Sequence, residues 1–79
     1  MAENLRNTIK SEWAPFIENQ INEVLEAAHA IRVATRLATP RHNDLIAKFA
    51  QQVQMAQELG FTLVIVETSD RFIRRIRLT

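Results

Sequence analysis

Apolar residues recur at helical spacing over the first three-quarters of the chain. Leu5, Ile9 and Trp13 lie four positions apart, which predicts a helix over the first dozen residues. Pro15 has no backbone N–H to donate and its ring crowds the preceding turn. We therefore expect a break near Ala14–Pro15, with a short N-terminal helix before it and a second helix that begins at the proline.

A long helix is predicted over residues 16–38. Its apolar positions step alternately by four and three residues, as in the seam of a coiled coil. They are Ile17, Ile21, Val24, Ala28, Ile31, Thr35 and Ala38. From Ala27 onward, apolar residues surround the helix except for a thin polar row of His29, Arg32 and Arg36. A helix of this kind is covered on two sides, so we expect either a sheet or another copy as the second cover.

Thr39–Pro40 marks the start of the next helix, because threonine is favoured at the N-cap and proline at the first helical position. This helix is predicted to run from Pro40 to Leu59 and to end at Gly60, a residue common at helix C-termini. Its apolar face comprises Ile46, Phe49, Ala50, Val53 and Ala56. A connection this short predicts that the two long helices are antiparallel.

The C-terminal segment is predicted to be a β-hairpin. Residues 61–67 (FTLVIVE) are rich in β-branched and aromatic residues, and a turn-like Thr68–Ser69–Asp70 follows. A two-residue turn at Ser69–Asp70 pairs Glu67 with Phe72, Ile65 with Arg74, Leu63 with Ile76 and Phe61 with Leu78. The alternative is a helix capped by Ser69, which would group Phe72, Ile73 and Ile76. We favour the hairpin.

Together these elements predict a single α+β domain over residues 1–79. The short N-terminal helix precedes two long antiparallel helices, and these two cover one face of the hairpin. A chain this small buries only about 60% of its unfolded surface, and it has no cysteine for a disulfide. A helix of ~24 residues, ~36 Å long, overhangs a compact globule of this size, ~30 Å across. Edge pairing of two hairpins would build a four-stranded sheet, so we expect a homodimer.

Composition and charge narrow the class of protein. Ten basic and nine acidic residues leave a net charge of +1, and 47% of the residues are apolar, which excludes a disordered chain. Residues 1–30 carry a net charge of −3 and residues 31–79 a net charge of +4, so the surface is dipolar. No apolar run has the length of a membrane span, and the start of the chain does not resemble a signal peptide. We expect a cytoplasmic protein without a membrane partner.

Candidate metal ligands are His29, His42 and Asp44, but their spacing matches no metal-binding pattern. We expect His42 and Asp44 to lie on a solvated helix start, where the helix dipole favours an acid. No metal and no cofactor is therefore predicted.

Catalytic groups are also not apparent. Ser11 and Ser69 lie where caps or turns use serine, and the single glycine excludes a glycine-rich phosphate loop. The carboxylates Glu23 and Glu26 are expected to form a solvated face together with Asn19 and Asn22. We expect no enzyme and no small-molecule substrate.

Two groups of arginines are the candidate partner-binding residues. The first has four arginines in seven residues: Arg71, Arg74, Arg75 and Arg77. The second comprises Arg32, Arg36 and Arg41. We expect a small adaptor or inhibitor that docks on a larger macromolecular machine, in the manner of the compact modulators of phages and other mobile elements. The alternative is a dimeric nucleic-acid-binding regulator that uses the C-terminal arginines, although a net charge of +1 is low for that class.

Overall fold

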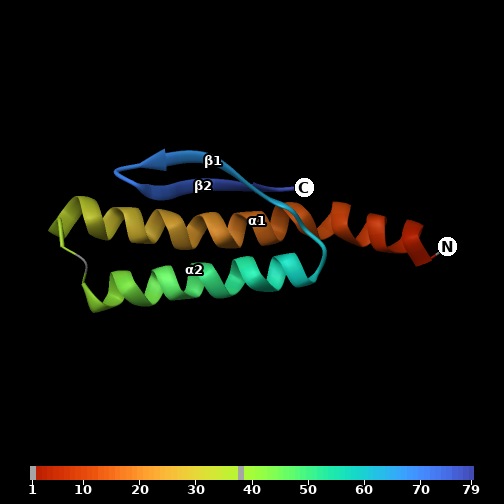
Figure 1. The fold of residues 1–79 in the computed structure, drawn as a ribbon, viewed down its shortest axis with the longest axis horizontal. Coiled ribbons are helices and arrows are strands. Elements are labelled where there is room, and N and C mark those ends of the chain that lie inside the picture. The colour runs from red at the N-terminus through yellow and green to blue at the C-terminus, as the bar shows by residue number, and fades with distance from the viewer. Residues whose placement is uncertain (1, 38) are drawn as a thin grey trace.

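A computed structural model describes residues 2–37 and 39–79, and Figure 1 shows two helices followed by a β-hairpin. The elements are α1 (Ala2–Thr35), α2 (Pro40–Glu58), β1 (Leu63–Ser69) and β2 (Phe72–Leu78). The predicted α+β class and the order of the long helices and the hairpin are confirmed. The segment after the turn is a strand, so the alternative of a C-terminal helix is wrong.

α1 continues through Pro15 as one helix of 34 residues. The predicted break near Ala14–Pro15, and with it a separate short helix, is not found. Proline removes one hydrogen bond and crowds the turn before it, which disfavours a continuous helix. Packing opposes this effect, because Ala14 and Ile17 contact the hydrophobic core while Pro15 lies exposed. These contacts on either side of the proline stabilise the uninterrupted helix.

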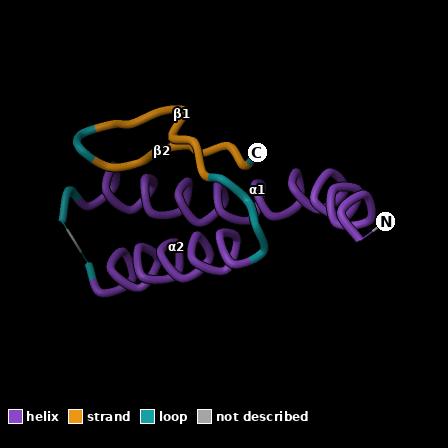
Figure 2. The backbone as a smooth tube through the Cα atoms, turned by 45° about the vertical axis from the view of Figure 1, so that its right-hand side comes forward, coloured by secondary structure: helices purple, strands orange, loops and turns teal. Residues whose placement is uncertain are grey.

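α1 is the central layer of the molecule. α2 lies along one side of α1 and the hairpin along the other, an order seen in both Figure 1 and Figure 2. Contacts join α1 to α2 and α1 to β2. α2 also reaches β2, since the rings of His42 and Phe72 meet and Ala56 shares the core with Ile76. The predicted packing of two helices on a two-stranded antiparallel sheet is confirmed. α1 contacts both neighbours through the middle of the helix, where its buried residues Ile21, Leu25 and Ala28 lie.

The hydrophobic core forms where α1, α2 and β2 meet. Its buried residues are Ile21, Val24, Leu25, Ala28, Ala56, Phe61, Ile76 and Leu78. The predicted stripe on α1 is thus buried at its middle positions. Val33 and Leu37, close to the end of α1, are exposed instead. Part of the apolar surface predicted to be covered on two sides is therefore open in the single chain.

α1 extends past the rest of the molecule. Its 34 residues correspond to ~51 Å of helix, which matches the longest molecular dimension of 51 Å. α2 has 19 residues and covers only ~28 Å. In Figure 1 the N-terminal part of α1 continues beyond the end of α2. The helix therefore overhangs the other elements, but at its N-terminal part, which was predicted to be a separate short helix.

The hairpin turn lies one residue later than predicted. Its central residues are Asp70 and Arg71, with φ of 50° and 72°, both left-handed. Two successive left-handed residues match the twist of the strands they join, as in a type I′ turn. Ile65 now pairs with Ile76 and Leu63 with Leu78, so the predicted pairs, including Ile65 with Arg74, are wrong. The shift matches apolar residues with apolar residues across the strands.

The two edges of the hairpin have different surroundings. Along β2, Asn22 bonds both the N–H and the carbonyl of Ile76, and Glu18 accepts the N–H of Leu78 at 2.9 Å. Both side chains come from α1, so the helix covers this edge. β1 is the other edge of the two-stranded sheet, and its middle residues Val64 to Val66 are 43–51% exposed. Within the described residues, the sheet has one covered edge and one open edge.

Candidate functional site

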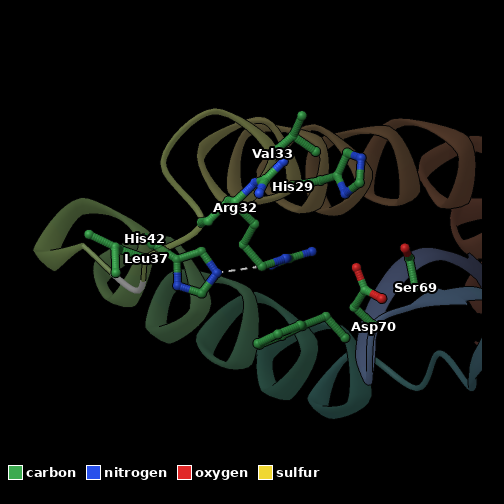
Figure 3. A pocket seen from close by; sticks show the side chains of 9 residues that line it. His29, Arg32, Val33, Leu37, His42, Ser69 and Asp70 are labelled. Atoms are coloured by element: carbon green, nitrogen blue, oxygen red, sulfur yellow. Dashed lines mark hydrogen bonds between the residues drawn. The ribbon is translucent and has the colours of Figure 1, made fainter.

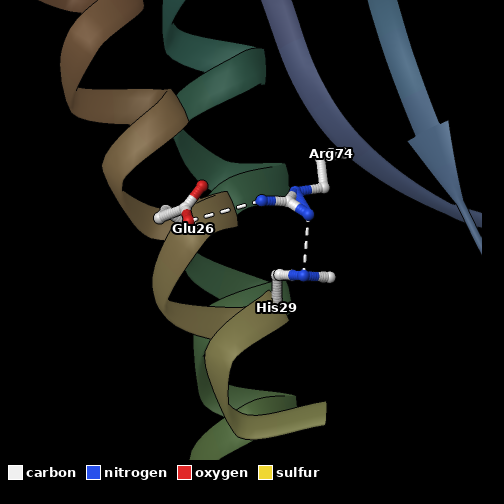
Figure 4. Close-up of polar contacts among 3 residues, drawn as sticks. All are labelled: Glu26, His29 and Arg74. Atoms are coloured by element: carbon white, nitrogen blue, oxygen red, sulfur yellow. Dashed lines mark hydrogen bonds and ion pairs between the residues drawn. The ribbon is translucent and has the colours of Figure 1, made fainter. Parts of the chain in front are cut away.

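The four hairpin arginines do not form one surface. Arg74 turns toward α1, where its Nη1 lies 2.7 Å from Nε2 of His29 and its Nη2 donates to Oε1 of Glu26 at 3.4 Å (Figure 4). The backbone helps to aim it, since the strand pairing is irregular between Glu67 and Ile73 and Arg74 has no partner in the register. The residues that stay exposed are Arg71, Arg75 and Arg77. Arg74 therefore belongs to the packing of β2 on α1.

The second predicted group is divided as well. Arg32 and Arg36 line one pocket near the end of α1. Arg41 is exposed in the first turn of α2 and does not line that pocket. The structure therefore brings together Arg32 and Arg36 and separates them from Arg41.

This pocket lies where the end of α1, the start of α2 and the hairpin turn meet (Figure 3). It is an open cavity of about 560 Å³. Its polar lining comes from His29, Arg32, Arg36, His42, Ser69 and Asp70. Its apolar lining comes from Val33, Leu37 and Phe72. Basic groups and apolar side chains thus share one concave surface.

Arg32 is at the centre of the pocket. Its Nη1 lies 2.9 Å from Nε2 of His42, a residue that is only 3% exposed. Because a guanidinium only donates, Nε2 accepts and the proton of the neutral imidazole is on Nδ1. The guanidinium carbon of Arg32 also lies 4.1 Å from the centre of the Phe72 ring, a cation–π contact. The Phe72 ring in turn meets His42 edge to face at 5.7 Å. Arg32 therefore connects all three elements around the pocket.

The position of Arg32 is electrostatically unfavourable. Burial lowers the pKa of its guanidinium, the carboxylate of Asp70 opposes that shift, and the nearby Arg74 adds to it. Figure 3 shows Arg32 reaching between His42 and Asp70. Two donor atoms here, Nη2 of Arg32 and Nδ1 of His42, are buried and make no hydrogen bond. Arg32 remains a cation at neutral pH, with part of its donor capacity unused.

Backbone strain gathers at the same end of the molecule. The non-glycine residues with left-handed φ in the described chain are Arg36 at 56°, Asp70 at 50° and Arg71 at 72°. Arg36 follows the last turn of α1, a place where glycine is usual. Arg36 and Asp70 both line the pocket. The chain therefore keeps side chains where glycine would adopt the backbone conformation more easily.

A separate aromatic surface lies on α1. The rings of Trp13 and Phe16 meet edge to face at 5.8 Å, and the two side chains are 51% and 55% exposed. Ala14 and Ile17, their neighbours in sequence, pack on the core. The aromatic pair therefore lies on the outer side of α1, in the same turns of the helix from which Ala14 and Ile17 contact the core.

The residues considered as metal ligands have other roles. His29 bonds Arg74 and His42 bonds Arg32, each through Nε2. Asp44 is exposed on α2. Within the described ranges 2–37 and 39–79, no three His, Cys, Asp or Glu side chains are close enough together to hold a metal ion.

Sequence reasoning missed several residues of these sites. The sequence patterns place Asp70 in the turn and Phe72 in a strand or its alternative helix, and they predict a solvated face for Asn22. Asn22 is in fact half-buried against β2. One signal was present: Glu18, Asn22 and Glu26 are four residues apart, which aligns three polar side chains along one side of a helix.

Comparisons of the chain with models of protein families, with curated proteins and with solved structures find no match. In the part of the chain that the structure describes, no helix is both long enough and apolar enough to cross a membrane.

Proposed function

We propose that this chain is a small non-enzymatic protein-interaction module, an inhibitor or adaptor that docks on a larger macromolecular machine, as modulators from phages and mobile elements do. The observation that carries the proposal is the exposed aromatic pair of Trp13 and Phe16. Tryptophan and other aromatic side chains dominate the binding energy of protein interfaces. Because this half-exposed pair lies on a helix, binding through it would not cost the conformational entropy of ordering a loop.

The proposal includes a homodimer built on the open edge of β1. An antiparallel pair of β1 strands about a two-fold axis near Ile65 would form a four-stranded sheet. It would cover the apolar residues at the middle of the strand. Glu67 is the acidic residue of β1, and the two-fold axis would place the two copies of Glu67 at opposite ends of the new pairing. The strand is thus compatible in charge with a copy of itself.

The test is affinity capture from a host lysate with the tagged full chain. A double variant, Trp13→Ala with Phe16→Ala, is compared with the control Asn19→Ala, an exposed position of the same helix. We expect one stoichiometric partner that the unchanged chain and the control retain and the double variant loses. Circular dichroism must show the same helix content in all three. Retention of the same partner by the double variant would contradict the proposed docking surface, and absence of any stoichiometric partner would contradict the function.

The alternative function is a dimeric nucleic-acid-binding regulator. It is favoured by Arg75 and Arg77, which are exposed on the two-stranded ribbon, and by Arg71 in the turn. A ribbon of this kind can follow phosphates or enter a major groove. Fluorescence anisotropy with mixed-sequence DNA and RNA at ~50 and ~200 mM salt separates the two functions. Micromolar binding that collapses at the higher salt, and disappears in Arg75→Gln with Arg77→Gln, would favour the regulator.

A further inference from the structure

The pocket between α1, α2 and the hairpin turn has donors that the chain does not use. Nη1 of Arg32 is taken by His42, but Nη2 is buried and makes no hydrogen bond. Arg36 supplies a second guanidinium from the exposed rim of the same pocket. A buried donor without an acceptor is unfavourable, so an acceptor from outside the chain would be stabilised there.

The charges around the pocket fit one kind of acceptor. Two guanidinium groups, of Arg32 and Arg36, line the pocket together with one carboxylate, that of Asp70, so positive charge is in excess among these three groups. Asp70 cancels one of the two positive charges, so a carboxylate monoanion neutralises the three groups, whereas a phosphate dianion leaves an excess of negative charge. The two oxygens of a carboxylate match donors from two guanidinium groups.

The apolar part of the lining indicates what lies beside that carboxylate. Val33 and Leu37 are exposed on α1, and Phe72 faces them from the start of β2. These side chains form the apolar side of the pocket, next to the arginines. An apolar side chain adjacent to the carboxylate would cover them and exclude water from the ion pairs, which strengthens those pairs.

We infer that this pocket binds a carboxylate of a protein partner, from an acidic side chain or from a chain terminus, next to an apolar residue. The carboxylate lies between Nη2 of Arg32 and the guanidinium of Arg36, and the apolar residue lies on Val33, Leu37 and Phe72. The left-handed backbone of Arg36 and Asp70 fits this role, because strain retained at non-glycine residues is typical of binding sites. The inference rests on the proposed function in one respect, namely that the ligand belongs to a protein.

The experiment is an NMR titration of the full chain with short capped peptides, following the ring signals of His29 and His42 and the Nε–Hε signals of Arg32 and Arg36. Acetyl-Leu-Glu-amide offers a side-chain carboxylate, and acetyl-Ala-Leu with a free terminus offers a terminal one. Acetyl-Leu-Gln-amide is the matched uncharged probe. We expect saturable shifts with a Kd of about 1 mM for at least one carboxylate peptide, and none for the glutamine peptide. Which of the two binds identifies the source of the carboxylate.

Two variants locate the binding. Arg36→Gln is expected to weaken it about tenfold, the effect of losing one charge-assisted hydrogen bond, and Arg36→Lys to restore part of it. Arg41→Gln, an exposed arginine outside the pocket, is the control and should bind as the unchanged chain does. The Arg36 side chain is exposed, so we expect these variants to fold, and circular dichroism checks this.

Three results would overturn the inference: no saturable shift with either carboxylate up to ~50 mM, equal binding of the glutamine peptide, or unchanged affinity in Arg36→Gln. Inorganic phosphate is titrated in parallel, and tighter binding of phosphate than of both peptides would also overturn it. The titration needs no partner protein. A failed lysate capture with successful peptide binding would reject the aromatic docking surface and keep the pocket. A successful capture without peptide binding would keep the docking surface and reject the pocket.

Discussion

The side-chain amide of Asn22 pairs with both backbone polar groups of Ile76. Its Nδ2 donates to the Ile76 carbonyl at 3.0 Å and its Oδ1 accepts the Ile76 N–H at 2.9 Å. In an antiparallel ladder, pairs that exchange backbone hydrogen bonds alternate with pairs that do not. Thr62 and Thr79 exchange both bonds, so counting along the register makes Ile65 and Ile76 a pair that does not. The backbone N–H and carbonyl of Ile76 therefore point away from β1. Asn22 therefore occupies the place that a third strand would take.

Replacing Asn22 should destabilise the fold far more than replacing its exposed neighbour Asn19. Asn22→Ala leaves the N–H and the carbonyl of Ile76 unpaired at a partly buried site, which should lower the free energy of unfolding by about 2 kcal/mol. Asn19→Ala, an exposed neighbour, should change it by less than about 0.5 kcal/mol. Urea unfolding followed by circular dichroism measures both. Equal values for the two variants would show that the amide does not secure β2.

The open edge of β1 predicts the oligomeric state. Ile65 pairs with Ile76 without exchanging backbone hydrogen bonds, so its N–H and carbonyl point away from β2 toward the open edge. Light scattering should therefore give a mass near twice the 9.1 kDa of the chain. Ile65→Lys places a charge at the centre of the pairing and should shift the mass to that of a monomer. Thr68→Lys, close to the end of β1, should remain dimeric. A monomeric unchanged chain at millimolar concentration would refute the dimer.

Arg74 and Arg75 are neighbours in sequence but should respond differently to substitution. Arg74→Ala removes the contact with His29, and we expect a loss of about 1.5 kcal/mol of stability. The ion pair with Glu26 adds little because the carboxylate is largely exposed. Arg75→Ala should lie within about 0.5 kcal/mol of the unchanged chain. Thermal unfolding distinguishes the two, and a neutral Arg74→Ala would show that its contact with α1 is not stabilising.

The hairpin turn predicts a substitution that stabilises the protein. Arg71 has φ of 72°, a conformation that costs residues with a Cβ roughly 1 kcal/mol and glycine almost nothing. Arg71→Gly should raise the free energy of unfolding by about 0.5–1 kcal/mol. Arg77→Gly, inside β2 and paired with Val64, is the contrasting variant and should lower the free energy of unfolding, because glycine weakens strands. A destabilised Arg71→Gly would indicate that the arginine side chain has a structural role.

Local patterns predicted most of the secondary structure. The stripe from Ile17 onward, the Thr39–Pro40 start and the single glycine at position 60 locate the long helices, because caps and apolar spacing act within one or two turns. The expected N-cap is present, with the Thr39 hydroxyl accepting the N–H of His42 at 3.1 Å. Residues 61–67 predict β1 through their β-branched and aromatic content, whereas the segment after Ser69 fits either a strand or a helix.

The sequence predicted the two long helices and β1 and named the candidate arginines, but it left residues 69–78 open between strand and helix. Contacts between distant segments decided that α1 runs through Pro15, that α1 lies between α2 and the hairpin, and that the turn falls at Asp70 and Arg71. They also decided that Arg74 is part of the packing while Arg32 and Arg36 share a pocket with Phe72, which is 40 positions away from Arg32. These outcomes depend on contacts between residues far apart in the chain. Local spacing does not encode such contacts, because the free energy of packing two elements is a property of both surfaces together.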